Sequence, residues 1–189
     1  SANNCIDKNS VKENIIVESN VLPPFDSASY DDVFRGVHNG VNFEIIESEL
    51  SCCYGRRRST IFDGVIILLD MNKKFTGQTN ITSGFFLNKS NLSNLRKTEL
   101  EDVQFEKNFD VYTNDEVEAR YLITPSFMQR LKTMQTAFRT DKMQCTFYDK
   151  YFIIALSTNR DLFSLCSLVR PISDWRPYCQ MYEEVISII

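Results

Sequence analysis

The sequence predicts a single α+β domain, residues 1–189, in which an antiparallel sheet of two or three hairpins packs with helices and could close into a barrel. Two hairpin patterns predict the sheet, one around Asn39-Gly40 and one around Asp149-Lys150. Helical patterns follow or separate the hairpins, and strands and helices do not alternate one by one, which argues against a parallel sheet. Residues 1–25 are mixed in character and could form a loosely packed N-terminal segment.

The first hairpin pattern joins residues 33–37 to residues 41–47 through His38-Asn39-Gly40. Both runs alternate apolar and polar residues, which is the period of a strand with one buried face. Asn-Gly is favoured between such runs because a type I′ turn needs a positive φ at both central positions. The second hairpin joins residues 143–148 to residues 151–156.

A buried central strand is predicted for residues 65–70, which are rich in Val, Ile and Leu and follow the turn residues Asp63-Gly64. Residues 71–74 then turn the chain, and residues 75–82 alternate as a paired strand. Further along, residues 83–98 are rich in Asn and Ser and are expected to cross the surface.

Helical patterns are more frequent in the second half of the chain. After a short strand at residues 109–112, Asn114 or Asp115 can cap a helical turn over residues 116–120. Thr124 followed by Pro125 predicts the start of a helix whose apolar face carries Phe127, Met128, Leu131, Met134 and Phe138. A C-terminal amphipathic helix is expected from 173 to 189, with one stripe formed by Tyr178, Met181, Tyr182, Val185, Ile186 and Ile189.

The composition excludes several classes of function. The net charge of −4 gives no basic excess, so we expect no nucleic acid partner. The longest aliphatic run, residues 65–69, is far shorter than the ~20 residues of a membrane helix. Because the chain begins Ser-Ala-Asn-Asn rather than with Met, we expect any targeting or membrane segment to lie upstream of these residues.

No recognisable catalytic site, metal site or cofactor motif is present in the sequence. The one histidine, His38, lies beside a predicted turn, where a solvated role is commoner than a catalytic one. No Cys or His spacing typical of a metal site occurs, nor a glycine-rich phosphate loop, so we expect no cofactor. The six cysteines are not spaced as a disulfide framework and are expected to be mostly free thiols.

Two groups of residues are candidates for binding. Asp115, Glu118 and Arg120 form an acidic turn in which Arg120 could pair with a carboxylate, and this turn could hold a polar ligand. Arg56, Arg57 and Arg58 form the basic run of a polar loop, residues 56–60, and could contact anionic lipid. Three charges are few for that role, so we expect weak or no vesicle binding by the chain without an anchor.

Three segments in order resemble a bacterial family known as domain of unknown function 3137. They are residues 36–50, which end in Glu47-Ser48-Glu49-Leu50, residues 61–79, and residues 105–131. The resemblance runs from about residue 30 to about residue 165. It implies the soluble part of a bacterial membrane-anchored protein on the cytoplasmic side, because members typically carry a pair of membrane helices ahead of this region. It supplies no catalytic residues.

These observations favour a non-enzymatic binding or interaction module whose partner is an unknown protein or small ligand, and which meets a membrane only through a segment missing from this chain. The alternative is a hydrolase that uses paired carboxylates in a cleft, since Asp and Glu residues are plentiful. A pocket of converging acids with raised pKa values would favour the enzyme, and a shallow or apolar groove would favour binding.

Overall fold

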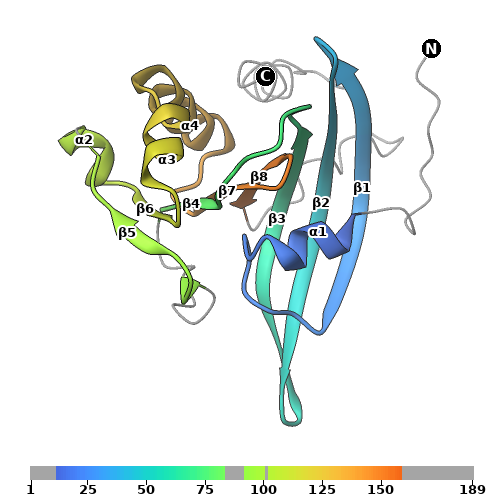
Figure 1. Cartoon of the computed structure of the whole chain (residues 1–189). Coiled ribbons are helices and arrows are strands. Elements are labelled where there is room, and N and C mark those ends of the chain that lie inside the picture. The colour runs from blue at the N-terminus through green and yellow to red at the C-terminus, as the bar shows by residue number, and fades with distance from the viewer. Residues whose placement is uncertain (1–11, 84–91, 101, 159–189) are drawn as a thin grey trace.

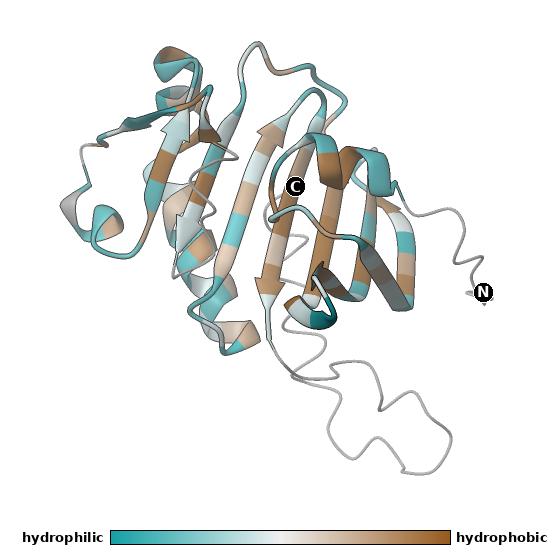
Figure 2. Cartoon of the chain, turned by 90° about the horizontal axis from the view of Figure 1, so that it is seen from below, coloured by the Kyte–Doolittle hydropathy of each residue, from teal (hydrophilic) through white to brown (hydrophobic). Residues whose placement is uncertain are grey.

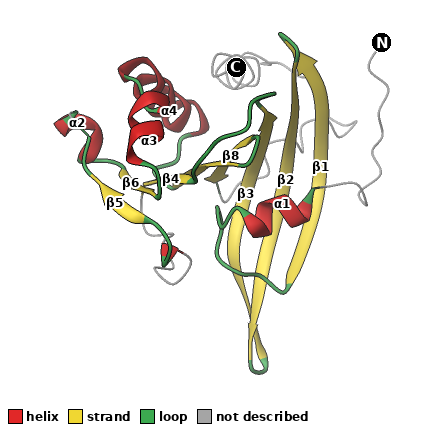
Figure 3. Ribbon diagram, in the orientation of Figure 1, coloured by secondary structure: helices red, strands yellow, loops and turns green. Residues whose placement is uncertain are grey.

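The structure is a computed structural model that describes residues 12–83, 92–100 and 102–158. Within them an eight-stranded sheet carries helices on both faces (Figure 1; Figure 3). The strands are β1 (Ser27–His38), β2 (Val41–Tyr54), β3 (Arg57–Asp70), β4 (Thr79–Ser83), β5 (Arg96–Thr98), β6 (Asp110–Thr113), β7 (Met143–Tyr148) and β8 (Tyr151–Ser157). The helices are α1 (Glu13–Glu18), α2 (Val103–Glu106), α3 (Glu116–Leu122) and α4 (Pro125–Phe138).

The sheet is antiparallel throughout, which confirms the predicted α+β class, and its strand order is β1-β2-β3-β8-β7-β4-β6-β5. β1 and β5 are its two edges, so the sheet is open and does not form the barrel that the sequence left possible. Closure requires the two edge strands to hydrogen-bond to each other. Here the three-residue β5 lies at the opposite end of the sheet from the twelve-residue β1.

Both predicted hairpins are present, and a third joins β2 to β3. In the first, His38 pairs with Val41 across a turn in which Asn39 has a φ of 48° and Gly40 a φ of 80°. These two positive values are the ones that a type I′ turn requires. In the hairpin of β7 and β8, Tyr148 pairs with Tyr151, as the pattern predicted.

The central strand β3 is buried on both faces, which explains its unbroken apolar run. Val65, Ile67 and Leu69 belong to one hydrophobic cluster, whereas Ile66 and Leu68 belong to the other. The two clusters lie on opposite faces of the sheet because successive side chains of a strand point in opposite directions.

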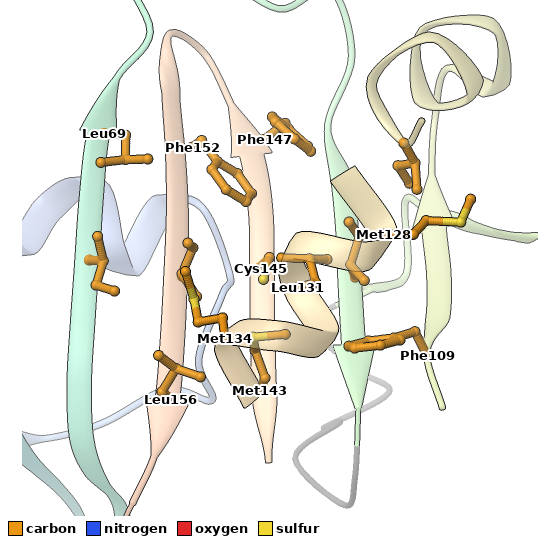
Figure 4. Packing of buried hydrophobic residues seen from close by; sticks show 14 of the residues in the cluster. Leu69, Phe109, Met128, Leu131, Met134, Met143, Cys145, Phe147, Phe152 and Leu156 are labelled. Atoms are coloured by element: carbon orange, nitrogen blue, oxygen red, sulfur yellow. The ribbon is translucent and has the colours of Figure 1, made fainter. Parts of the chain in front are cut away.

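The larger cluster lies between the sheet and α4 (Figure 4). The Thr124 hydroxyl caps α4 by accepting from the Phe127 backbone N–H, and the helix ends at Arg139, whose φ is 52°. Its buried residues are Met128, Leu131, Met134 and Phe138, which confirms the predicted apolar face. They pack on β7 and β8, where the Phe147 and Phe152 rings stack 4.4 Å apart.

α1 covers the other face of the sheet (Figure 2). Ile16 of this helix and Val21 and Leu22 after it are buried against β2 and β3, where their partners include Ile46 and Ile66. Figure 2 shows hydrophobic residues both in α1 and in the strands beneath it. The sheet is therefore the middle layer of three.

Several boundaries differ from the sequence-based expectation. Residues 75–78 are not part of a strand, because β4 begins only at Thr79, and residues 83–98 include the short strand β5. Arg57 and Arg58 belong to β3 rather than to a loop. The expected C-terminal helix lies outside the described residues. None of the described helices is long and apolar enough to cross a membrane.

Candidate functional site

A cleft of about 570 Å³ opens on the side of the sheet that carries α1. Its walls come from α1, from the segment of residues 75–78 that precedes β4, from Asn114 and from the turn between β7 and β8. The polar side chains among its lining residues are Asn14, Glu18, Thr76, Gln78, Asn114, Tyr148, Asp149, Lys150 and Tyr151. Its volume is within the range of small-molecule sites.

Glu118 of α3 holds the 75–78 segment in place. Its Oε1 accepts a hydrogen bond from the Thr76 backbone N–H at 3.0 Å, and its Oε2 accepts one from the Gly77 backbone N–H at 2.8 Å. A Cβ on Gly77 would lie 2.6 Å from the Cβ of Asp115, so a side chain there would push the segment away from α3. We refer to the two hydrogen bonds from the Thr76 and Gly77 backbones to Glu118 as the Glu118 clamp. It explains why residues 75–78 are not part of the strand that their alternating pattern predicts.

Asp115 completes the clamp and caps α3. Its Oδ1 accepts from the Glu118 backbone N–H at 3.0 Å, and its Oδ2 accepts from the Thr76 hydroxyl at 3.1 Å. These hydrogen bonds, first from the Glu118 backbone and then from Thr76, hold the pKa of Asp115 below its ordinary value. The predicted pair Asp115 and Glu118 is thus brought together, but behind the cleft wall, where it positions the wall.

Arg120 does not join this pair. Its Nη2 donates to the backbone carbonyl of Glu99 at 3.4 Å, so it links α3 to the segment after β5. Among the described residues Arg120 forms no ion pair with a carboxylate, and its pairing stays a prediction.

Gln78 connects the cleft wall to both neighbouring elements. Its Nε2 donates to the Ser19 carbonyl at 2.6 Å, at the end of α1, and to Asn80 Oδ1 of β4 at 3.0 Å. Its backbone N–H donates to Asn114 Oδ1 at 2.7 Å. The side-chain amides of Gln78 and Asn114 are therefore held in fixed directions.

The turn between β7 and β8 lines the cleft beside the 75–78 segment, since the Phe75 backbone N–H donates to the Asp149 carbonyl at 2.6 Å, and it carries two charged residues. Lys150 Nζ lies 2.6 Å from Asp70 Oδ2, and Lys74 Nζ lies 3.1 Å from Asp149 Oδ1. Burial would raise the pKa of Asp70, but hydrogen bonds from Lys150 and from the Asn72 backbone outweigh it and lower that pKa. The hydrogen bond to Asp70 raises the pKa of Lys150.

Glu18 and Tyr148 face each other across the cleft. The Tyr148 hydroxyl donates to Glu18 Oε2 at 3.5 Å, which is a long hydrogen bond. Burial, followed by the charges of Glu18 and Asp149, raises the pKa of the Tyr148 hydroxyl. Glu18 is the last residue of α1, where the helix dipole disfavours a negative charge, and the last turn holds no basic residue. The Glu18 carboxylate therefore does not stabilise α1 through the helix dipole.

The other candidate residues lie elsewhere. The structure places Arg56 in the turn between β2 and β3, and Arg57 and Arg58 at the start of β3, apart from the cleft. His38 ends β1 and does not line the cleft. Among the described residues, no group of three His, Cys, Asp or Glu side chains could hold a metal ion.

The three described cysteines, Cys52, Cys53 and Cys145, are free thiols. Burial raises the pKa of the Cys145 thiol. The pKa of Cys52 is raised because its thiol donates to Asp26 Oδ2 at 3.3 Å. Both shifts disfavour the thiolate, which is the reactive form.

Sequence reasoning singled out Asp115 and Glu118, but as ligand-binding residues rather than as residues that hold the 75–78 segment, and it missed Glu18, Gln78 and Tyr148, which line the cleft. The one local signal was the carboxylate of Glu18 at the end of a short helix pattern that lacks a basic residue in its last turn.

A model of the family described as "Protein of unknown function (DUF3137)" matches residues 60–189. The resemblance noted at residues 36–50 lies outside the matched range. A search of curated proteins found no match. Among solved structures, the crystal structure of the mycobacterial trehalose monomycolate transport factor A, TtfA, is similar with a TM-score of 0.49 and 8% sequence identity, over 86% of this chain and 74% of that chain.

Proposed function

The chain belongs to the family described as protein of unknown function DUF3137, and we propose that it is a non-enzymatic binding module of a bacterial, membrane-anchored protein and holds a small polar ligand in its cleft. The observation that carries the proposal is the cleft of about 570 Å³, which is lined by amide, hydroxyl and carboxylate groups and has one wall, the 75–78 segment, fixed by the backbone hydrogen bonds to Glu118. The membrane anchor and the cytoplasmic side are proposed from what the resemblance implies for members of the family.

The charges of the cleft suggest the chemistry of the ligand. Asp149 and Lys150 already have partners of opposite charge in Lys74 and Asp70. Among the described residues, the Glu18 carboxylate pairs with no cation and accepts only the long hydrogen bond from Tyr148. A ligand with one ammonium group would offset this charge, and hydroxyl groups would suit the surrounding amides. We therefore propose an amino sugar or an amino alcohol as the ligand class.

The alternative hydrolase has weaker support from the geometry. Glu18 and Asp149 both line the cleft, but Asp149 is already engaged in an ion pair with Lys74. A general acid needs a carboxyl with a raised pKa. Asp63 is such a carboxyl, because burial and then Glu49 raise its pKa, yet it lies outside the cleft. This separation favours binding over acid–base catalysis.

Saturation-transfer NMR on the whole chain tests the proposal with three probes of similar size, glucosamine, glucose and glucose 6-phosphate. We expect transfer to glucosamine above that to glucose, and none to the phosphate ester. Glu18→Gln should remove the preference for glucosamine, whereas the control Glu116→Gln, at an exposed position of α3, should keep it.

Equal transfer to all three probes, or a preference that Glu18→Gln leaves unchanged, would contradict the proposed ligand class. A nitrophenyl glucosaminide serves as the test of the alternative. If the chain released nitrophenol from it, and Glu18→Gln or Asp149→Asn abolished the release, the hydrolase would replace the binding module.

A further inference from the structure

The hairpin of β2 and β3 extends beyond the rest of the sheet (Figure 1; Figure 3). The pairing of β1 with β2 ends at Ser51, and the pairing of β8 with β3 begins at Gly64. Past these points, residues 52–54 pair only with residues 57–59. We refer to residues 53–60, all of which are exposed, as the hairpin tip. It projects from the molecule as a narrow two-stranded ribbon.

The hairpin tip is positively charged although the chain as a whole has a net charge of −4. It contains Arg56, Arg57 and Arg58, and no Asp or Glu occurs between residues 50 and 62. Asp26 approaches its base, where it accepts from the Cys53 backbone N–H at 2.7 Å. Glu49 also lies at the base, where its Oε1 accepts from the Thr60 hydroxyl at 2.9 Å, so the basic charge is concentrated at the far end of the ribbon.

The three arginines have different surroundings. Arg58 is tied to the base of the ribbon, since its Nε donates to Ser51 Oγ at 2.7 Å and its Nη2 to Ser27 Oγ at 2.6 Å. Within the described part of the chain, Arg56 and Arg57 form no ion pair. Their guanidinium groups are therefore available to an external anion.

Tyr54 adds an apolar element to the hairpin tip. It pairs with Arg57 across the ribbon, and 68% of its surface is exposed. Tyrosine is enriched at membrane–water interfaces, because its ring suits the headgroup level and its hydroxyl reaches water. Arginine beside it would find lipid phosphates at the same depth.

We propose that the hairpin tip docks on an anionic membrane surface, with Arg56 and Arg57 on lipid phosphates and Tyr54 at the headgroup level. A lipid surface fits better than a folded protein, because a stable protein interface needs about 800 Å² on each side and a narrow convex tip offers no such area. A membrane is a deformable plane that a projecting tip can reach while the acidic body stays away from it. This inference does not rest on the cleft.

The expected affinity is modest. Each basic residue near an anionic surface increases partitioning about five-fold, so Arg56 and Arg57 together supply about 25-fold. An increase of about 25-fold in partitioning is detectable at low salt and is lost when salt screens the attraction between the arginines and the lipid phosphates. The sequence alone led us to expect weak or no vesicle binding, and the projecting tip now favours weak binding. Such binding would orient a domain already tethered to the membrane.

The test uses the full chain with Tyr54→Trp as a reporter and vesicles of phosphatidylglycerol mixed with phosphatidylcholine. At low salt, we expect the tryptophan emission to shift to shorter wavelengths on anionic vesicles and not on pure phosphatidylcholine. Tyr121→Trp, at an exposed site of α3, is the matched control and should not shift. Trp175, the single tryptophan of this chain, contributes equally to both reporters.

Adding Arg56→Gln and Arg57→Gln to the Tyr54→Trp reporter should reduce partitioning about 25-fold. Arg96→Gln with Arg130→Gln makes the same change in net charge at exposed sites elsewhere, and it should leave partitioning nearly unchanged. The proposal is wrong if the emission of the Tyr54→Trp reporter does not respond to anionic vesicles, or if both double substitutions weaken binding equally. Tighter binding of a DNA duplex than of vesicles through the same arginines would also overturn the membrane as the partner.

Discussion

Replacing Glu118 with alanine would release the 75–78 segment from α3 and deform the wall of the cleft. Two backbone N–H groups, those of Thr76 and Gly77, would lose their acceptors at 3.0 Å and 2.8 Å. A hydrogen bond to a charged group contributes about 1.5–3 kcal/mol when buried, and less where water can replace the lost partner. The bond to Thr76 is exposed and the bond to Gly77 is partly buried, so we expect a total loss of about 2 kcal/mol.

For a chain of this size, such a loss lowers Tm by roughly 4–8 °C. Glu116→Ala is the matched control, because Glu116 lies in the same first turn of α3 and is exposed. The Glu116→Ala substitution should lower the free energy of unfolding by only about 0.5 kcal/mol, because it removes a negative charge from the positive end of the helix dipole. Glu118→Gln should fall between the two, since its amide keeps one acceptor oxygen but turns an NH₂ group toward the second N–H donor.

Urea denaturation followed by circular dichroism measures the three unfolding free energies, and amide chemical shifts at Thr76 and Gly77 report on the segment. If Glu118→Ala and Glu116→Ala lost the same free energy and left these shifts alike, the clamp would contribute nothing and our account of the cleft wall would be refuted.

Three further predictions concern the core, pH and the thiols. Leu131→Ala, at a fully buried position of α4, should lower the free energy of unfolding measured by urea denaturation by about 2–5 kcal/mol. The pKa of Asp70 is lowered in the folded state from its ordinary value of 3.8. The interaction of Asp70 with Lys150 therefore stabilises the protein at pH values above 3.8, and this stabilisation is lost as the pH falls through the lowered pKa. Lys150→Gln should therefore destabilise the protein at neutral pH, and a series of unfolding curves should show the difference shrink in acid. A thiol reagent should modify Cys53 in the native protein, whereas Cys145 should react only after unfolding.

The features that the sequence predicted well depend on neighbouring residues. Asn39 and Gly40 can adopt positive φ values wherever they occur, so the hairpin of β1 and β2 follows from a local pattern. The start of α4 follows in the same way from Thr124 and Pro125. The unbroken apolar run of β3 correctly predicted a strand with both faces covered.

The features that the sequence did not predict depend on contacts between residues far apart in the chain. The strand expected at residues 75–82 loses its first half because Glu118, about forty residues later, takes the N–H groups of Thr76 and Gly77. Whether the sheet closes depends on the positions of the edge strands β1 and β5 relative to each other, which no local sequence pattern specifies. The cleft likewise combines Glu18 and Tyr148, which lie 130 positions apart. The expected binding role of Asp115 and Glu118 stays a prediction, with a positioning role now the better supported one.

The central claim, that the cleft binds a small amino-bearing polar ligand, is tested most directly by titrating isotope-labelled chain with glucosamine and following the backbone amides. We predict that the largest shift changes occur at Gln78, Asn114 and Tyr148, and that Glu18→Gln suppresses them. Changes of equal size at α4, or changes that survive Glu18→Gln, would contradict the claim.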